Sequence, residues 1–169
     1  MREGELADWN RIVEQHANHV FRVAMRILGC AQDAEDVSQD VFIEAFRLQQ
    51  VDRVQSWPGL LVRLATLRAL DHLRRKRPSE KLREGDRIST QGPFDDAAAK
   101  ELATRMRIAI AELPDQQAAA FVLFHFEHLS RDEIGLSLGV TPEAVSTALY
   151  KARQRLLAQL ATIQQGESR

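Results

Sequence analysis

Small polar and basic side chains recur at helical spacing near the C-terminal end of the chain, and their chemistry suits nucleic acid. The set comprises Arg131, Thr141, Glu143, Ser146, Thr147, Tyr150, Lys151 and Arg153. Hydroxyl, carboxylate and ammonium groups hydrogen-bond to base edges, and guanidinium groups bind backbone phosphates. We therefore expect this set to contact duplex DNA, with Arg131 and Arg153 on the phosphates.

The segment that must position these side chains has the capping and turn residues of a helix-turn-helix. Ser130 and Glu133 have the spacing of a capping box, in which each side chain accepts a hydrogen bond from the other residue's backbone N–H. Gly139 is the residue type that ends helices in a left-handed turn, and Thr141-Pro142 supplies the cap and first residue of the next helix. Such a second helix fits the major groove of DNA. The alternative is a solvated helical hairpin in an all-α protein.

Charge along the chain is divided into blocks that suggest a second nucleic-acid contact. The net charge is −5 over residues 1–52, +6 over 53–87, −4 over 88–141 and +2 over 142–169. Two basic blocks separated by acidic ones are expected of a protein that binds nucleic acid twice and a protein partner through its acidic faces. The alternative is ordinary charge variation at solvated helix ends.

Apolar residues recur every three or four positions along most of the remaining chain, which predicts helices. The predicted helices span about 6–28, 31–48, 56–77, 95–113 and, after Pro114, residues up to about His128. The helix that Asp95 would cap has an apolar stripe of Leu102, Met106, Ala109, Ile110 and Leu113. No strand-like alternation is present, so the predicted fold class is all-α.

Residues 79–94 lack an apolar period and are rich in turn residues. They predict a flexible linker between two small helical domains, which span 1–78 and 95–163. A linker of this length can extend over more than one turn of duplex DNA. The two domains could therefore hold one DNA molecule at two sites.

The composition favours a soluble intracellular protein without catalytic chemistry. The lone Cys30 can form neither an internal disulfide nor a cysteine-rich zinc site, and no apolar run has the length of a signal core or membrane span. No glycine-rich phosphate loop is present, and the pairs His16/His19 and His125/His128 lack further metal ligands. We expect surface or packing roles for these histidines, and no enzyme activity, cofactor, metal, small-molecule substrate or membrane insertion.

Three segments resemble bacterial sigma factors. Residues 33–42 (DAEDVSQDVF) resemble the DAED-x-x-Q-x-x-F motif of that family. Residues 113–156, with Leu113-Pro114, Leu129-Ser130-x-x-Glu133-Ile134 and Lys151-Ala152-Arg153-x-x-Leu156, resemble the fourth sigma domain. Residues 63–75 are similar to the minus-ten region. The short chain with two domains and a bare linker resembles the extracytoplasmic-function (ECF) type.

The resemblance implies that the chain binds core RNA polymerase at the clamp helices and flap, and directs it to promoter DNA. It implies polymerase docking by an exposed acidic face of Asp33, Glu35, Asp36, Gln39, Asp40 and Glu44. It implies minus-ten contacts by Trp57, Arg63, Arg68, His72, Arg74, Arg75 and Arg77. The residues of the predicted helix-turn-helix would then bind the minus-thirty-five element. An anti-sigma factor is the implied regulator.

Departures from the family pattern bear on DNA preference. Leu67 stands where the family often has an asparagine that lines a pocket for a flipped base. Ser146 and Ala148 stand where it commonly has cations, so we expect two cationic contacts to be missing from the groove face. The acidic face could instead be an ordinary solvated helix surface. Trp57 could instead be a core residue. Two other functions stay open: a stand-alone helix-turn-helix regulator, and a degenerate sigma-like protein that titrates a partner.

Overall fold

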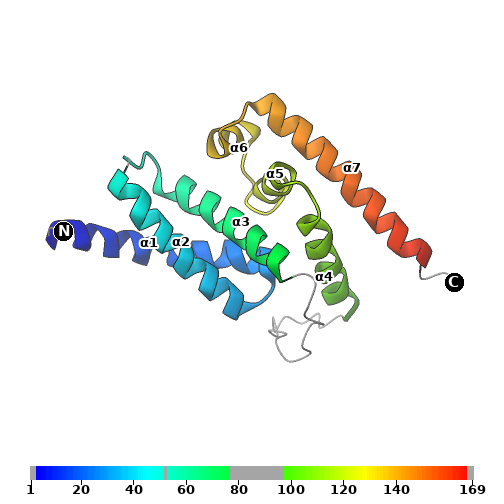
Figure 1. Ribbon diagram of the computed structural model, residues 1–169, viewed down its shortest axis with the longest axis horizontal. Helices are drawn as coiled ribbons and strands as arrows, with labels where there is room; N and C mark the ends of the chain where they lie inside the picture. The colour runs from blue at the N-terminus through cyan, green and yellow to red at the C-terminus, as the bar shows by residue number, and fades with distance from the viewer. Residues whose placement is uncertain (1–2, 52, 77–96, 167–169) are drawn as a thin grey trace. The chain divides into compact units, whose positions relative to one another are not determined.

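The computed structural model describes residues 3–51, 53–76 and 97–166, and within these ranges every regular element is a helix. The helices are α1 (Glu3–Leu28), α2 (Ala31–Val51), α3 (Trp57–Arg75), α4 (Ala97–Ala111), α5 (Asp115–His125), α6 (Arg131–Leu138) and α7 (Pro142–Gly166) (Figure 1). This confirms the all-α prediction. None of these helices is both long and apolar enough to cross a membrane.

The contacts divide the chain into two units, Met1–His72 and Leu73–Arg169, which are treated separately below. The predicted linker, 79–94, and the predicted cap Asp95 lie outside the described residues. The linker and the domain bounds built on it therefore stay predictions.

The first unit is built on the packing of α1 against α2. The apolar spacing fitted one long helix or two short ones that stop at Gly29, and the structure has one continuous helix, α1, that ends at Leu28. The buried apolar side chains of the unit come from α1, α2 and α3. The core comprises Val20, Val23, Ala24, Ile27, Leu28, Ala34, Val37, Val41, Ala45, Leu61, Val62, Leu64, Ala65, Ala69 and Leu70.

α3 begins as the sequence predicted, because the Ser56 Oγ accepts a hydrogen bond from the Gly59 N–H at 3.3 Å. Its interior holds a residue that the apolar pattern did not mark. Thr66 is fully buried, and its hydroxyl has no hydrogen-bond partner among the residues that the structure describes. A buried hydroxyl in this state lowers stability, since its desolvation is not compensated.

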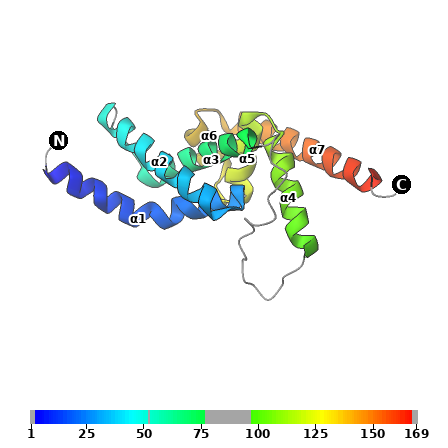
Figure 2. The same ribbon diagram turned by 60° about the horizontal axis from the view of Figure 1, so that its bottom comes forward.

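In the second unit, α7 packs against α4, α5 and α6 and continues as one helix toward the C-terminal end (Figure 1, Figure 2). The capping box is complete: the Ser130 N–H donates to the Glu133 Oε2 at 2.8 Å, and the Glu133 N–H donates to the Ser130 Oγ at 3.2 Å. The Thr141 Oγ1 accepts from the Ala144 N–H at 3.2 Å and caps α7. The helix-turn-helix prediction is therefore confirmed down to its hydrogen bonds.

Two glycines shape the turn between α6 and α7 for different reasons. Gly139 has φ of 69°, a backbone conformation that side chains with a Cβ rarely adopt. Gly135 lies where a Cβ would come within 2.7 Å of the Val140 carbonyl oxygen. The first glycine permits the turn, and the second permits the close approach of the two helices.

Two predictions for the second unit are wrong in detail. α5 ends at His125, three residues before the predicted end, because the chain leaves the helix at Phe126 and His128 takes φ of 56°. Leu102 was placed in the buried stripe of α4, but 56% of it is exposed. Ala109 and Ile110 of the predicted stripe are buried, and so is Ala111, which was not part of it.

Candidate nucleic-acid and protein interfaces

α2 presents the predicted acidic face over its first three turns. Glu35, Asp36, Gln39 and Asp40 are all exposed, and the last three lie on one side of the helix at i, i+3 and i+4 spacing. Ile43 continues the same side and is 50% exposed, which the charge pattern did not reveal. The face is thus a set of polar groups next to one apolar side chain.

Two carboxylates assigned to this face are bound inside the first unit instead. Asp33 is buried, and its Oδ1 lies 3.3 Å from the Nε2 of His72 on α3. The predicted exposure of Asp33 is wrong, because the first turn of α2 lies against the end of α3. The Glu44 side chain is 29% exposed, and its Oε2 accepts a hydrogen bond from the Nε of Arg68. The hydrogen bond of Glu44 therefore joins α2 to α3, and Asp33 lies beside His72 between the same two helices.

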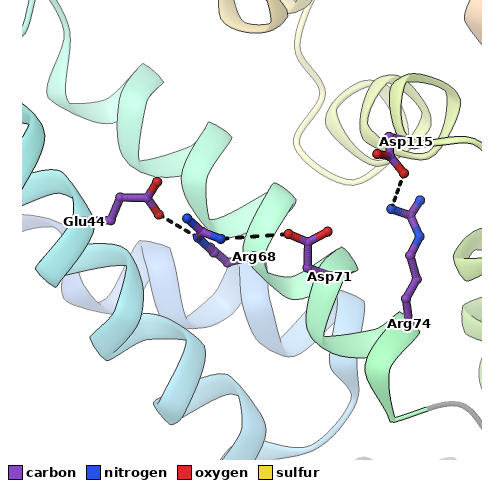
Figure 3. A network of polar contacts seen from close by, with 5 residues as sticks. All are labelled: Glu44, Arg68, Asp71, Arg74 and Asp115. Carbon is purple, nitrogen blue, oxygen red and sulfur yellow. Dashed lines mark hydrogen bonds and ion pairs between the residues drawn. The ribbon is translucent and has the colours of Figure 1, made fainter.

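Arg68 is held by carboxylates on both sides (Figure 3). Its Nε lies 2.6 Å from the Oε2 of Glu44, and its Nη1 lies 3.9 Å from the Oδ2 of Asp71. The hydrogen bond that Arg68 donates to Glu44 is the largest cause of the raised pKa of Arg68. Burial lowers this pKa, and the charges of Glu44, Asp71 and Asp40 raise it further. This guanidinium therefore ties α2 to α3, and its contact with promoter DNA stays a prediction.

The other predicted minus-ten residues fall into different environments. Arg63 and Arg75 are exposed, and Leu67 is half-buried. Arg74, which the contacts group with the second unit, donates to the carbonyls of Ala111 and Leu113 and to the carboxylate of Asp115 (Figure 3). Arg77 lies outside the described residues.

Trp57 belongs to an aromatic cluster in the first unit. Its ring centroid is 5.7 Å from that of Trp9, which also contacts Phe46 at 5.1 Å and Phe42 at 6.2 Å in edge arrangements. These contacts favour the core role for Trp57, although the ring is only half-buried. No local pattern could indicate that Trp9 is the partner, because it lies almost fifty positions away.

α7 separates its buried and exposed faces as predicted. Val145, Leu149, Ala152 and Leu156 are buried. The predicted DNA-contacting side chains of the helix are all exposed: Glu143, Ser146, Thr147, Tyr150, Lys151 and Arg153. This arrangement leaves the whole polar set available to a groove.

The two hydroxyl groups at the start of this face each donate a hydrogen bond within α7. The Ser146 Oγ donates to the Pro142 carbonyl and the Thr147 Oγ1 donates to the Glu143 carbonyl, each at 3.0 Å. With the proton used inside the helix, the oxygen lone pairs face outward. These two side chains are therefore arranged to accept hydrogen bonds, as from an exocyclic amino group of a base.

One expectation about this helix is wrong. Ala148 was taken as the site of a missing cation on the groove face, but only 6% of it is exposed. It lies next to Leu149 on the packed side, where a long cationic side chain would be buried. Ser146 is therefore the only one of the two departures that lies on the exposed face.

Comparisons with known proteins agree with this architecture. Residues 12–78 match the family model of sigma-70 region 2, and residues 104–156 match that of sigma-70 region 4. The chain is 34% identical over 164 residues to the ECF RNA polymerase sigma factor SigE of Mycolicibacterium smegmatis, with 94% of this chain and 64% of the relative covered. It is 28% identical to SigW of Bacillus subtilis, with 95% and 92% covered.

Solved structures show the same fold. The sigma factor RpoE in complex with the anti-sigma factor NepR from Bartonella quintana has a TM-score of 0.57 and 16% identity, covering 91% of this chain and 97% of that chain. CnrH in complex with the cytosolic domain of CnrY has a TM-score of 0.58 and 22% identity, covering 91% and 88%. Two family models matched in sequence order, together with a relative above 30% identity along nearly the whole chain, show that this protein belongs to the sigma-70 family of RNA polymerase sigma factors, in its ECF group.

Proposed function

We propose that this chain binds core RNA polymerase and directs it to promoters by contacting their minus-ten and minus-thirty-five elements. The observation that carries this proposal is α7, a capped second helix of a helix-turn-helix whose polar side chains are all exposed opposite a buried stripe. A groove-binding helix in the same chain as an acidic docking face is what a promoter-selecting subunit needs. The chain spans 64% of the SigE relative, which is a longer protein.

Polymerase docking is assigned to the exposed part of α2. Asp36, Gln39 and Asp40 offer carboxylates and an amide to a basic helical partner such as the clamp helices. Complementary charges steer the encounter and fix its register, while an apolar group among them excludes water. Ile43 supplies that apolar group, since half of its surface is exposed. Asp33 and Glu44 act from behind this face by fixing α2 on α3.

DNA contact is divided between the units. In the first unit, Arg63 is the exposed cation best placed to attract promoter phosphates, because Arg68 is bound to Glu44. In the second unit, base reading is assigned to Glu143, Ser146, Thr147, Tyr150 and Lys151 of α7, and phosphate contact to Arg131 and Arg153. The flap of the polymerase is the proposed partner for the rest of this unit.

Regulation by an anti-sigma factor is part of the proposal. Two observations support it. The structural neighbour RpoE was solved in complex with the anti-sigma factor NepR, and this chain exposes large apolar side chains. Leu136 on α6 is 86% exposed, for example, and apolar surface of that kind marks interaction sites. The proposed place of action is the cytoplasm, where RNA polymerase works.

The test is retention of core RNA polymerase by the purified chain, followed by mapping of transcript start sites on genomic DNA. The variant Asp36→Lys/Asp40→Lys should lose retention, whereas Glu14→Lys, an exposed carboxylate on α1 of the same unit, should keep it. Defined start sites with the wild-type chain support the proposal. Retention without defined start sites indicates a titrating protein, and duplex binding without retention indicates a stand-alone regulator; either result rejects it.

A further inference from the structure

A group of basic side chains gathers where α5 ends, next to α6 and α7, and the proposed function uses only half of it. His125 is the last residue of α5, His128 lies in the connection to α6, Arg131 begins α6, and Arg153 lies on α7. These four residues form the histidine–arginine cluster. The two histidines had been assigned to packing or surface roles.

Aromatic contacts hold two members of the cluster in place. The ring centroid of His125 lies 4.5 Å from that of Phe121 and 5.0 Å from that of Phe124. The guanidinium carbon of Arg131 lies 5.3 Å from the centroid of the same Phe124 ring. A flat ring that touches both groups orders them without neutralising their charge.

The positive charges of the cluster are not balanced from within. Burial lowers the pKa of His125, and the charges of Arg153 and His128 lower it further; no carboxylate contributes. Among the residues that the structure describes, neither Arg131 nor Arg153 forms an ion pair. Clustered cations without internal partners create a positive potential that attracts anions.

The carboxylates on the neighbouring elements do not change this balance. Glu127, in the connection between α5 and α6, is half-buried and has an interaction of its own. Glu133, in the first turn of α6, is bound by Ser130 in the capping box. Asp132, beside Arg131, is exposed and does not act on the pKa of His125.

His128 has a backbone conformation that calls for a reason. Its φ of 56° lies in the left-handed region, which few residues other than glycine occupy. Such conformations persist where the surrounding structure enforces them, and they gather at functional sites. Here the His128 side chain is exposed, three positions before Arg131 in the sequence.

We propose that the histidine–arginine cluster is a phosphate-binding site for the backbone of the minus-thirty-five duplex, flanking the groove that α7 enters. This inference rests on the proposed function, because it assumes that α7 meets DNA. A phosphodiester in the cluster replaces repulsion between cations with attraction. His125 then takes up a proton when DNA binds.

This proton uptake makes DNA affinity depend on pH in a defined direction. In the free protein the pKa of His125 lies below its ordinary value, and an adjacent phosphate raises it. Affinity for duplex therefore increases as the pH falls through the pKa of the complex, and it levels off below the pKa of the free protein. Each unit of pKa difference corresponds to about a tenfold change in affinity.

The experiment measures binding of the full chain to a fluorescein-labelled duplex of mixed sequence, by anisotropy at constant low ionic strength. A mixed sequence suffices, because phosphate contacts are independent of base sequence. Between about pH 8 and pH 6 the wild-type chain should gain about tenfold in affinity. His125→Gln/His128→Gln should gain less than about twofold over the same range. His16→Gln, which alters a histidine of α1, should keep the wild-type profile.

A second measurement follows the imidazole resonances of His125 by NMR as duplex is added. A rise in the pKa of His125 with duplex, larger than with inorganic phosphate alone, supports the site. The inference is overturned if duplex leaves that pKa unchanged, if the double variant keeps the wild-type pH profile, or if no duplex binds. If only the phosphate site is wrong, the chain still retains core polymerase. If the chain does not retain core polymerase but its duplex affinity still depends on pH through the histidines, only the proposed function is rejected.

Discussion

The Nε atom of Arg68 lies 2.6 Å from the Oε2 atom of Glu44, so two side chains predicted for opposite partners are bound to each other. Arg68 had been assigned to promoter DNA and Glu44 to the polymerase. Their bond joins α2, which carries the acidic face, to α3, which carries the exposed Arg63. The geometry of one proposed interface therefore depends on the other through this pair.

Loss of the Arg68–Glu44 pair should lower stability modestly. Arg68→Ala and Glu44→Gln should each reduce the free energy of unfolding by about 0.5–1 kcal/mol, because the pair is partly exposed and screened by water. Urea denaturation of both single variants and the double variant gives the coupling energy. Strict additivity of the two effects would contradict a direct interaction.

Replacement of Thr66 should stabilise the protein. Thr66→Val keeps the shape of the side chain and removes a buried hydroxyl without a partner, so the free energy of unfolding should rise by about 1 kcal/mol. Thr66→Ser is the matched control: it keeps the hydroxyl and loses a buried methyl group, which should cost about 1 kcal/mol. A Val variant less stable than wild type would show that the hydroxyl has a partner in solution.

A methyl group at Gly135 should lower both the stability of the protein and its affinity for duplex. Its Cβ would meet the Val140 carbonyl oxygen at 2.7 Å, a backbone atom that cannot move without shifting the turn. Gly135→Ala should therefore cost about 1–3 kcal/mol and weaken duplex binding, because α7 changes its position. Gly139→Ala should cost about 1–2 kcal/mol through backbone strain alone, since a Cβ there has open space around it. Thermal unfolding and duplex affinity of the two variants separate these effects.

The capping box should make the helix-turn-helix sensitive to acid. Backbone and side-chain hydrogen bonds with Ser130 hold the pKa of Glu133 below its ordinary value of 4.5. The ionised carboxylate therefore stabilises the fold above that value, and the contribution is lost as the pH falls from 4.5 through the folded-state pKa. Glu133→Gln and Ser130→Ala should each flatten the acid limb of a stability–pH curve recorded by circular dichroism. A limb that stays as steep as in the wild type in both variants would refute the assignment.

Adding cations to α7 should distinguish its two faces. Ser146→Lys places a cation on the exposed face, so it should tighten duplex binding and increase the slope of log affinity against log salt by about 1. Ala148→Arg places the cation on the packed face and should instead destabilise the second unit by about 2–4 kcal/mol. Anisotropy across a salt series and urea denaturation test the pair. Equal gains in affinity from both variants would show that Ala148 faces DNA.

Local sequence patterns were enough to predict the helix-turn-helix. The capping box of Ser130 and Glu133 forms between residues three positions apart, and Gly139 and Thr141 act within one turn of the chain. The alternation of buried and exposed residues along α7 follows from helical geometry alone. These features need no knowledge of distant residues, which is why the predictions for them are confirmed.

Long-range contacts decided what the charged residues of the first unit do. The sequence pattern around a surface carboxylate is the same whether the carboxylate faces solvent or a cation from another helix. Only the packing of α2 against α3 placed Asp33 beside His72 and Glu44 beside Arg68. Contact between α1 and α3 also brought Trp57 to Trp9. In the second unit, Leu102 of α4 is exposed at a position that helical spacing had marked as buried.

The sequence by itself therefore determined the all-α fold, the helix-turn-helix and the family, because helix periods, caps and turns are properties of neighbouring residues. The tertiary structure alone decided which charges are available to a partner, because a charge is neutralised by whatever the fold brings within a few ångströms. The histidine–arginine cluster shows the same division: His125 and Arg153 come from different helices, and only the fold places their charges together.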